Sequence, residues 1–341
     1  MPPSSGRVTI YEVADEARVA ISTVSRVLNG SPEVSDATRA KVQAAIEKLQ
    51  FQPQRIAKSL AQQATTSLAV ALPSATSLFY VEILKGVKDV LRDRDIDLLL
   101  CNLGSSNPEQ TLQRFIGRGA VGGLLLASLQ IDDALGEQLR RMHAPVVSIG
   151  GRNAGFDSFW WNDEAGARKA TEHLLELGHR RIGIITSQAW SYASEPRLRG
   201  YRAALESAGI AFDPELVAAG TTTKHAGFSE EVGAEAMAEL LALEHPPSAV
   251  FSSSDVQAFG AWAHARDSGL VVPRDLSILG YDNLKLSRYL NLTSIDQRMQ
   301  EVGRRATERL LSRMESRDDD RLDIEIPLEL MVRGSTGPYE G

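Results

Sequence analysis

Residues 9–29 have the sequence TIYEVADEARVAISTVSRVLN, which predicts two short helices joined by a turn. Thr9 and Glu12 form a capping box, the pattern in which two residues at a helix start satisfy each other's backbone N–H groups. The first helix is therefore expected to run from there to about Ala17. Apolar residues at helical spacing predict the second helix over 21–28. The stretch thus predicts the start of a small helical domain.

A third helix and a shorter fourth segment follow. The third helix is predicted from the cap Ser35 to about Leu49. Pro53 precedes a segment over 54–62 that has helix formers but few apolar residues, and a helix this short is marginal alone in water. Residues 64–67 are expected to be a junction. Apolar positions at helical spacing suffice for a three-helix core: Val13, Ala14, Ala17, Val19, Val24, Val27, Leu28, Val34, Val42, Ala45, Ile46 and Leu49.

From Leu68 onward, short β-type runs alternate with longer helical runs. Strands are predicted over 68–72, 96–101, 121–127, 145–149, 182–186, 216–219, 249–251 and 276–279. Helices are predicted over 81–92, 165–177, 198–208, 234–243 and 256–267. Such alternation is typical of parallel sheets with helices on both faces. Because the run is too long for one sheet, we expect an α/β body of two Rossmann-like lobes, with a ligand cleft at the C-terminal strand ends.

The net charge of −7 is unevenly distributed along the chain. Residues 1–62 carry a net charge of +2, and the rest of the chain carries −9. A mildly basic head on an acidic body is typical of a protein with a DNA-binding end. A solvated surface would give the same small excess, so the charge alone decides nothing.

The single cysteine and the lack of long apolar runs bear on the cellular setting. Cys101 lies in an apolar run and is interpreted as a buried small side chain. One cysteine allows no intramolecular disulfide, which fits a reducing cytosol. The first residues lack the apolar core of a signal peptide, and no run approaches the roughly 20 apolar residues that span a bilayer. We therefore expect a soluble, cytoplasmic protein.

An enzyme is one competing interpretation. Residues 117–122 match GxGxxG, but the dinucleotide fingerprint needs a strand before it and a helix after it, and here the strand over 121–127 follows. The histidines show no metal-ligand spacing, and Cys101 lacks the polar, exposed setting of a nucleophile. We therefore expect no catalytic residue, no metal and no cofactor.

The helical stretch resembles the helix-turn-helix of the LacI/GalR family of bacterial transcription regulators. The resemblance continues through residues 34–60, and it extends at least over 8–333. Three segments of the body are similar to family landmarks in the same order: GHRRIG at 178–183, RLRGY at 197–201 and LGYDN at 279–283. The resemblance implies an all-α helix-turn-helix head with a hinge helix, joined to a two-lobed, periplasmic-binding-protein-like body.

The resemblance also implies how the head would bind DNA. The helix that starts at Ile21 would enter the major groove with its first residues facing base edges. Arg26 can form a bidentate contact with guanine, Ser22 can donate or accept a hydrogen bond, and Ile21 can pack on a thymine methyl group. A second set would bond phosphates and set the register without reading sequence: Tyr11, Thr23, Ser25, Asn29 and Thr38.

Two residues depart from the family pattern. Arg18 stands where the family usually has glycine, at a turn position where a positive φ is often needed. Ala20 stands where Ser or Thr usually caps the recognition helix, and losing a cap costs about 1 kcal/mol. Both departures predict a less stable head, and Arg18 can add a phosphate contact.

The resemblance implies a hinge helix within 51–66 that lies in the minor groove beside its counterpart from a second subunit. Leu60 would be the wedge inserted between the central base pairs, unless it is a linker residue that packs on the body. Arg55 and Lys58 would meet phosphates or groove edges. Because so short a helix does not persist alone, its folding would be coupled to dimerisation and DNA binding. The hinge is therefore the expected switch.

In the body, the resemblance places a small-molecule effector between the lobes. The candidate contacts combine aromatic, amide, cationic and carboxylate groups: Phe79, Tyr80, Asn162, Trp190, Tyr192, Arg197, Asp255 and Asp282. This combination suits a sugar or sugar derivative, and flat aromatic rings would equally suit a purine or nucleoside. Trp160, Trp161 and Trp262 are interpreted as core residues. Residues 284–294 lack the proline common there in the family, which leaves the local interface contacts open.

These inferences predict a domain organisation and a function. The head is expected over 1–50, the hinge helix and linker over 51–66 and the effector-binding and dimerisation domain over 67–341. Its lobes are assigned with approximate bounds: an N-lobe over 67–160 plus 295–320 and a C-lobe over 161–292 plus 321–335. We expect a homodimeric repressor that binds a pseudo-palindromic double-stranded operator and responds to an effector. A transport-type solute-binding protein is the alternative class, but it would need an export signal and no DNA-binding head.

Overall fold

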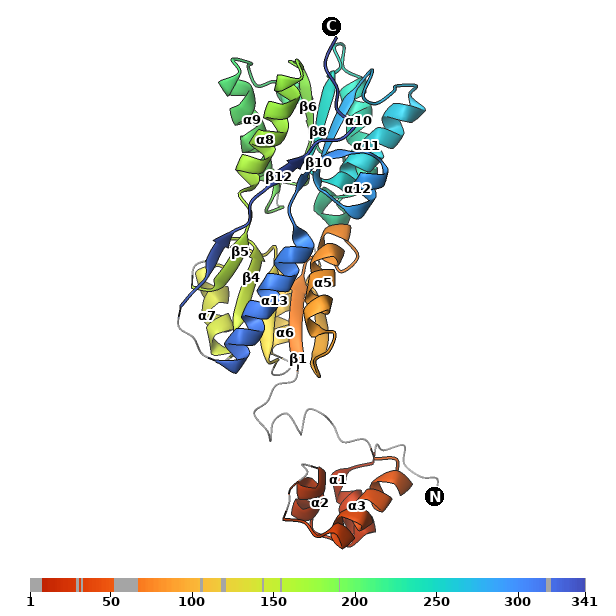
Figure 1. Cartoon of the computed structure of the whole chain (residues 1–341), viewed down its shortest axis with the longest axis vertical. Coiled ribbons are helices and arrows are strands. Elements are labelled where there is room, and N and C mark those ends of the chain that lie inside the picture. The colour runs from red at the N-terminus through yellow and green to blue at the C-terminus, as the bar shows by residue number, and fades with distance from the viewer. Residues whose placement is uncertain are drawn as a thin grey trace. The chain divides into compact units, whose positions relative to one another are not determined.

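The computed structural model describes residues 8–28, 31, 33–51, 67–104, 107–117, 121–142, 144–153, 155–189, 191–316 and 320–340. The chain separates into two compact units, with the boundary between Thr66 and Ser67. The first unit is helical, and the second contains two sheets flanked by helices (Figure 1).

The small unit contains three helices: α1 (Ile10–Ala17), α2 (Ile21–Leu28) and α3 (Asp36–Lys48). The predicted capping box is present, because the Thr9 backbone N–H donates to the Glu12 carboxylate at 2.7 Å. Arg18 ends α1 in the left-handed region, with φ 52° and ψ 49°, which costs a residue with a Cβ about 1 kcal/mol. The buried side chains belong to the predicted core: Val13, Ala14, Ala17, Val24, Val27, Val42 and Ala45.

The first lobe of the large unit is a parallel sheet with strand order β11-β5-β4-β3-β1-β2. Its strands are β1 (Ser67–Leu72), β2 (Asp97–Asn102), β3 (Gly123–Ala127), β4 (Val146–Gly150), β5 (Asp157–Trp160) and β11 (Asp323–Glu325). Its helices are α5 (Leu78–Leu91), α6 (Pro108–Ile116), α7 (Asp133–Arg141) and α13 (Met299–Glu315). The central strand β3 is buried throughout, as expected for a strand covered on both faces.

Helices α5 and α13 pack closely against each other on one face of this sheet. Gly86 of α5 and Gly303 of α13 make this approach possible, because a Cβ on Gly86 would lie 2.0 Å from the Gln300 carbonyl oxygen. Side chains of α6 and α7 pack on the opposite face in a second core cluster.

The second lobe is a sheet with strand order β12-β10-β9-β8-β6-β7, in which β12 is antiparallel to β10 and the other pairs are parallel. Its strands are β6 (Ile182–Ile185), β7 (Val217–Ala218), β8 (Ala249–Ser252), β9 (Ser277–Asp282), β10 (Thr293–Asp296) and β12 (Glu329–Met331). Its α-helices are α8 (Asp163–Glu176), α9 (Ser194–Ser207), α10 (Glu230–Leu241), α11 (Asp255–Asp267) and α12 (Lys285–Tyr289). The 3₁₀ turns are η1 (Pro214–Leu216) and η2 (Lys224–Gly227).

The chain passes between the lobes at residues 161–162, 297–298 and 326–328. Hydrogen bonds join these three crossover segments and the residues next to them. The Trp161 indole N–H donates to the Gln297 carbonyl at 2.8 Å, and the Ile326 N–H donates to the Trp160 carbonyl at 2.8 Å. The lobes are therefore joined along one side, where β5, β10 and β11 end (Figure 1).

The two-lobed α/β prediction is confirmed, but the predicted lobe boundaries near the C-terminus are wrong. The N-lobe segment was predicted to start at 295, whereas Ile295 and Asp296 pair with β9 in the second sheet. The C-lobe segment was predicted to start at 321, whereas β11 pairs with β5 in the first sheet. The physical reason is that β10 and β11 are strands of four and three residues, too short for their own sequence to indicate a sheet, so their sheet membership is set by tertiary pairing. In the described part of the chain, no helix combines the length and apolarity needed to cross a membrane.

Candidate functional site

The predicted base-reading residues lie on the outer side of α2. Val24 and Val27 hold the inner side of the helix in the head core. Ile21 is 42% exposed despite being apolar, and Ser22 and Arg26 are exposed as well. Within the described residues of the head, no carboxylate pairs with Arg26. These side chains are therefore accessible to a partner as large as double-stranded DNA and can enter one of its grooves.

The predicted phosphate-bonding residues are only partly available. Tyr11 is 64% exposed at the start of α1, and Thr23 and Ser25 are half-buried. The Thr38 hydroxyl shares a hydrogen bond of 2.9 Å with the Ser35 hydroxyl. Four further predicted DNA contacts lie outside the described residues: Asn29, Arg55, Lys58 and Leu60.

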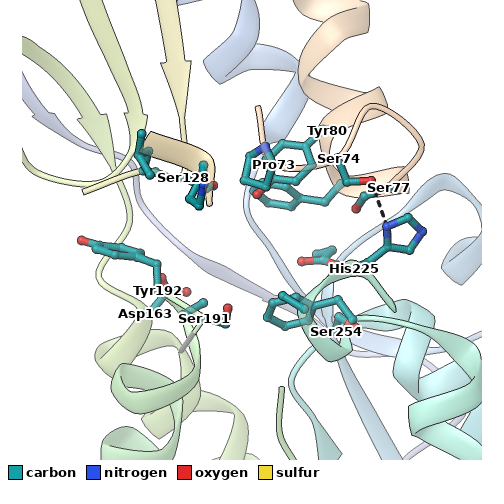
Figure 2. Close-up of a pocket in the computed structure, with 18 of the residues that line it drawn as sticks. Pro73, Ser74, Ser77, Tyr80, Ser128, Asp163, Ser191, Tyr192, His225 and Ser254 are labelled. Atoms are coloured by element: carbon teal, nitrogen blue, oxygen red, sulfur yellow. Dashed lines mark hydrogen bonds between the residues drawn. The ribbon is translucent and has the colours of Figure 1, made fainter. Parts of the chain in front are cut away.

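A cavity of about 800 Å³ lies between the two lobes of the body. Its walls come from the C-terminal ends of parallel strands, where open α/β sheets bind ligands. Ser74 and Ser77 follow β1, Ser128 follows β3 and Ser254 follows β8. Figure 2 shows residues of the first lobe, including Tyr80, facing those of the second across the cavity. The volume is within the range of small-molecule sites, about 300–1,000 Å³.

Arg197 and Asp163 form a buried ion pair in the wall of this cavity. Nε and Nη2 of Arg197 lie 2.9 and 2.8 Å from Oδ1 of Asp163, and the two side chains are 5% and 6% exposed. Nη1 donates to the Ser253 carbonyl, and the guanidinium carbon lies 3.8 Å from the centre of the Tyr281 ring. Burial alone would lower the pKa of Arg197, but the attraction to Asp163 together with smaller effects of Tyr281 and Asp282 outweighs burial, and the pKa is raised. The pair is therefore neutral as a unit.

Asp282 is the last residue of β9 and lines the cavity, and one of its two carboxyl oxygens accepts a hydrogen bond within the protein. The Gln297 side-chain amide donates to Asp282 Oδ1 at 2.6 Å. Burial, reinforced by the nearby Asp255 carboxyl group, raises the pKa of Asp282 well above its usual range. A protonated carboxyl group both donates and accepts hydrogen bonds, as a hydroxyl does. The chain bends sharply here, because Asp282 has a φ of 120°.

Two predicted effector contacts do not line the cavity. Asn162 caps α8, and its side-chain oxygen accepts from the Ala165 N–H at 3.0 Å. Asp255 is fully buried and accepts from the Leu284 N–H at 2.7 Å and from the hydroxyls of Ser287 and Ser294. Trp190 lies outside the described residues. The other predicted contacts line the cavity: Phe79, Tyr80, Tyr192, Arg197 and Asp282.

Aromatic rings form part of the cavity wall. Phe79 meets Tyr80 edge to face, with ring centres 5.0 Å apart, and Trp161 at 5.7 Å. Trp161 is thus buried as predicted, yet it also lines the cavity. Burial raises the pKa of Tyr80 to about 12, although a hydrogen bond with the Ser128 side chain opposes this, so its hydroxyl stays protonated at neutral pH. Phe228 adds a further ring from the second lobe.

Several lining residues were not predicted from the sequence. Asp163 directly follows the predicted Asn162, and Ser254 directly precedes the predicted Asp255, so the right strand ends were identified but not the right side chains. His225 and Phe228 lie between β7 and α10, and no periodic pattern in this stretch of sequence marks them as part of a site. Metal ligation is not indicated, because no three His, Cys, Asp or Glu side chains cluster suitably in the part of the chain that the structure describes.

A helical head with an exposed face on α2, together with a two-lobed body that has a ligand-sized cavity between its lobes, is the architecture of a ligand-responsive DNA-binding regulator. Residues 9–54 match the family described as bacterial regulatory proteins, lacI family. Residues 171–336 match the periplasmic binding protein-like domain.

Similar proteins extend this match over almost the whole chain. The chain is 33% identical to the transcriptional repressor CytR of Escherichia coli, over 96% of this chain and 96% of that protein. It is 32% identical to catabolite control protein A of Priestia megaterium, over 96% and 99%. It is 30% identical to the transcriptional repressor PurR of Vibrio atlanticus, over 96% and 98%.

Solved structures agree with these relatives. A cellobiose complex of the transcriptional regulator CelR aligns with a TM-score of 0.69 at 33% identity, over 96% of this chain and all of that one. A lac repressor dimer bound to operator and an anti-inducer aligns with a TM-score of 0.73 at 27% identity, over 97% and 100%. This chain belongs to the lacI family of bacterial transcription regulators, and its head is a DNA-binding domain.

Proposed function

We propose that this protein is a homodimeric repressor whose inter-lobe cavity binds an uncharged polyhydroxy effector, a sugar or sugar derivative. The observation that carries the proposal is that Asp163 neutralises Arg197, so the cavity offers no unpaired arginine or lysine among its described lining residues. An unpaired Arg or Lys is the strongest partner for a phosphate or carboxylate group, so its absence among the lining residues disfavours a charged ligand. An uncharged ligand needs no such cation.

Hydroxyl groups in the cavity support a sugar in particular. Side-chain hydroxyls line it from both lobes, and each can donate or accept as a sugar hydroxyl can: Ser74, Ser77, Ser128, Ser191, Ser254, Tyr80 and Tyr192. Aromatic rings supply apolar faces for the C–H faces of a sugar ring. Two similar structures carry sugars, the CelR complex with cellobiose and a LacI-family regulator from Enterococcus faecium with ribose.

A nucleoside is the second candidate. Phe79, Trp161 and Phe228 offer flat surfaces on which a base can stack, and a nucleoside is uncharged. The two candidates differ in what they require: a base needs fixed donors and acceptors in its plane, whereas a sugar is satisfied by hydroxyls that rotate.

Base reading is assigned to Ile21, Ser22 and Arg26, whose side chains share the free side of α2. Tyr11 is the most exposed phosphate-contact candidate. Leu60, with Arg55 and Lys58, remains a proposal for the minor groove, as does the hinge segment over 51–66 as the element whose folding responds to the effector.

Dimerisation is supported by apolar surface at the edge of the first sheet. Strand β2 is an edge strand, and three successive apolar residues on it are exposed: Leu98, Leu99 and Leu100. An exposed apolar edge strand is a ready site for pairing with another chain. We expect Leu99→Asp to shift the protein from dimer to monomer in sedimentation velocity. Val271→Asp, at an exposed apolar residue in the other lobe, is the control: Val271 is 46% exposed and Leu99 is 39% exposed. A Leu99→Asp dimer as tight as the control would contradict this interface.

A thermal-shift screen of the full chain tests the effector class. The compounds are cellobiose, ribose, adenosine and glucose 6-phosphate. An effector at 100 times its Kd stabilises by about 2.7 kcal/mol, and we expect this of an uncharged sugar. Asp282→Ala should abolish the shift and leave operator binding intact. Stabilisation by adenosine alone would favour the nucleoside, and stabilisation by glucose 6-phosphate would refute the neutral-ligand argument.

A further inference from the structure

A histidine and a serine join the two lobes at the rim of the cavity, away from the crossovers. Nδ1 of His225, on η2 of the second lobe, lies 2.9 Å from the Ser74 hydroxyl oxygen, which follows β1 of the first lobe (Figure 2). Both residues line the cavity. Their neighbours Thr76 and Lys224 are exposed, so the hydrogen bond lies where the cavity meets solvent.

A second contact spans the lobes on the other side of the cavity. Tyr192 lies just before α9, and its phenol group lies beside Gly151 of the first lobe, since a Cβ built on Gly151 would be 3.6 Å from both Cζ and the hydroxyl oxygen of Tyr192. Figure 2 shows Tyr192 and His225 on opposite sides of the cavity. These two contacts, together with the crossovers, bridge the lobes at separate points around the cavity.

The loop that carries His225 adopts a conformation that its residues do not favour. His225 and Ala226 have φ values of 50° and 59°, in the left-handed region that costs residues with a Cβ on the order of 1 kcal/mol each. Such strain persists only where the surrounding structure imposes it, and it is concentrated at functional sites.

Buried contacts hold this loop in place. The Gln257 side chain is fully buried and donates to the Gly227 carbonyl at 2.9 Å and to the Thr186 carbonyl at 3.0 Å. The Gln188 N–H donates to the Ala226 carbonyl at 3.0 Å. Gln257 belongs to α11, whose first residues line the cavity. The conformation that presents His225 to the opposite lobe is therefore built into the second lobe.

We propose that His225 and Ser74 form a latch that closes the cavity mouth and sets how readily the effector enters and leaves. The latch rests on the proposed function in one respect, that the cavity is the effector site. The closing contact is a single hydrogen bond between side chains, so it forms and breaks without disturbing the core of either lobe. A ligand that leaves the latch intact is held behind it, and one too large for the closed cavity must break it.

Hydrogen–deuterium exchange on the full chain without ligand tests the latch directly. The Ser77 N–H donates to the Ser74 carbonyl at 3.4 Å, and the Phe228 N–H donates to the His225 carbonyl at 3.1 Å, so each of these amides lies in a turn that the latch holds against the opposite lobe. Without the latch both turns open more readily, and an amide exchanges when its own hydrogen bond opens. We expect His225→Ala to speed exchange in peptides that contain Ser77 and Phe228 by on the order of fivefold, because one side-chain hydrogen bond is lost.

Matched variants separate the hydrogen bond from the loop strain. Asn places its amide near the position of Nδ1 and tolerates a positive φ, so His225→Asn should keep exchange near the wild-type rate. Ala226→Gly removes strain but leaves the imidazole in place, and it should also exchange as wild type does. Ser74→Ala should match His225→Ala, and the double variant should be no faster than either single variant. Unchanged exchange in both single variants, or effects that multiply in the double variant, would overturn the latch.

Cellobiose serves as the probe for the ligand arm of the test. In stopped-flow measurements we expect it to leave His225→Ala on the order of fivefold faster than the wild type, for the same reason. If cellobiose binds neither protein, the sugar proposal loses its support, while the exchange data alone still decide the latch. If cellobiose binds both with equal dissociation rates, the latch does not gate the site and is refuted.

Discussion

Removing the guanidinium of Arg197 should destabilise the body strongly, and the structure indicates by how much. Two nitrogens lie within 3 Å of one Asp163 oxygen, at 2.9 and 2.8 Å. At 2.8 Å and an effective dielectric constant of about 20, unit charges attract by about 6 kcal/mol before the desolvation of both groups is subtracted. Arg197→Leu leaves the buried Asp163 carboxylate without its partner. The expected loss in the free energy of unfolding is about 3–5 kcal/mol.

A double-mutant cycle gives this prediction its sharpest form. Asp163→Leu should cost a similar amount, because it leaves the guanidinium buried and unpaired. The double variant removes both charges at once, and replacing a buried pair by apolar side chains is often close to neutral. We therefore expect the double variant to be more stable than either single variant, which requires a coupling energy larger than each single loss of about 3–5 kcal/mol.

Urea unfolding followed by tryptophan fluorescence is the appropriate assay. All four tryptophans lie after residue 66, so the signal reports on the body and not on the head. The denaturant slopes of the variants must agree for the midpoints to be compared. If the two single effects add in the double variant to within about 0.5 kcal/mol, the pair is not coupled and the reasoning from the buried ion pair fails.

Three further predictions concern single residues. Arg18→Gly should stabilise the head by about 1 kcal/mol, because glycine adopts a positive φ without a Cβ clash; calorimetry of the full chain would show the head transition at a higher temperature, and a lower one would contradict the strain. Arg26→Ala should cost about 1–3 kcal/mol of base discrimination at one operator position, which a base-substitution panel measures, and an unchanged preference would remove Arg26 from base reading. Burial raises the pKa of Asp255 from 3.8 to about 6, so the folded state holds this proton more tightly than the unfolded chain does. Its stabilising contribution is present below about pH 4 and is lost by about pH 6, which amounts to about 3 kcal/mol; Asp255→Asn should flatten the stability profile in that window, and an unchanged slope would argue against it.

The elements that the sequence predicted are those with local signals. The capping box at Thr9 and Glu12 depends on two residues three positions apart, and the structure contains it. Long buried strands such as β1 and β3 are apolar runs in any context. By contrast, β12 consists of Glu329, Leu330 and Met331, and it becomes a strand because β10 is beside it. No window of the sequence contains that information.

The site was located to within one residue at two strand ends, and the residual error has a physical cause. Where a strand leads into a helix, one residue caps the helix and its neighbour points elsewhere. Asn162 is the cap of α8, so Asp163 is the carboxylate that meets Arg197. Ser254 caps α11, since its hydroxyl accepts from the Gln257 N–H at 3.2 Å. Asp255 then turns into the lobe. Which neighbour faces the cavity depends on helix-start geometry that residue type alone does not set.

Gln297 illustrates the part of the site that only the assembled fold can define. Its backbone carbonyl accepts from the Trp161 indole, and its side-chain amide donates to Asp282. One residue thus links the first crossover, the crossover into α13 and the carboxyl group that ends β9. A ligand that bonds to Asp282 at the cavity wall must share that carboxyl group with Gln297. Any change in the hydrogen bond between Gln297 and Asp282 therefore acts on a residue that joins the lobes. Gln297 makes its other bond with Trp161, which is more than 100 positions away in the sequence.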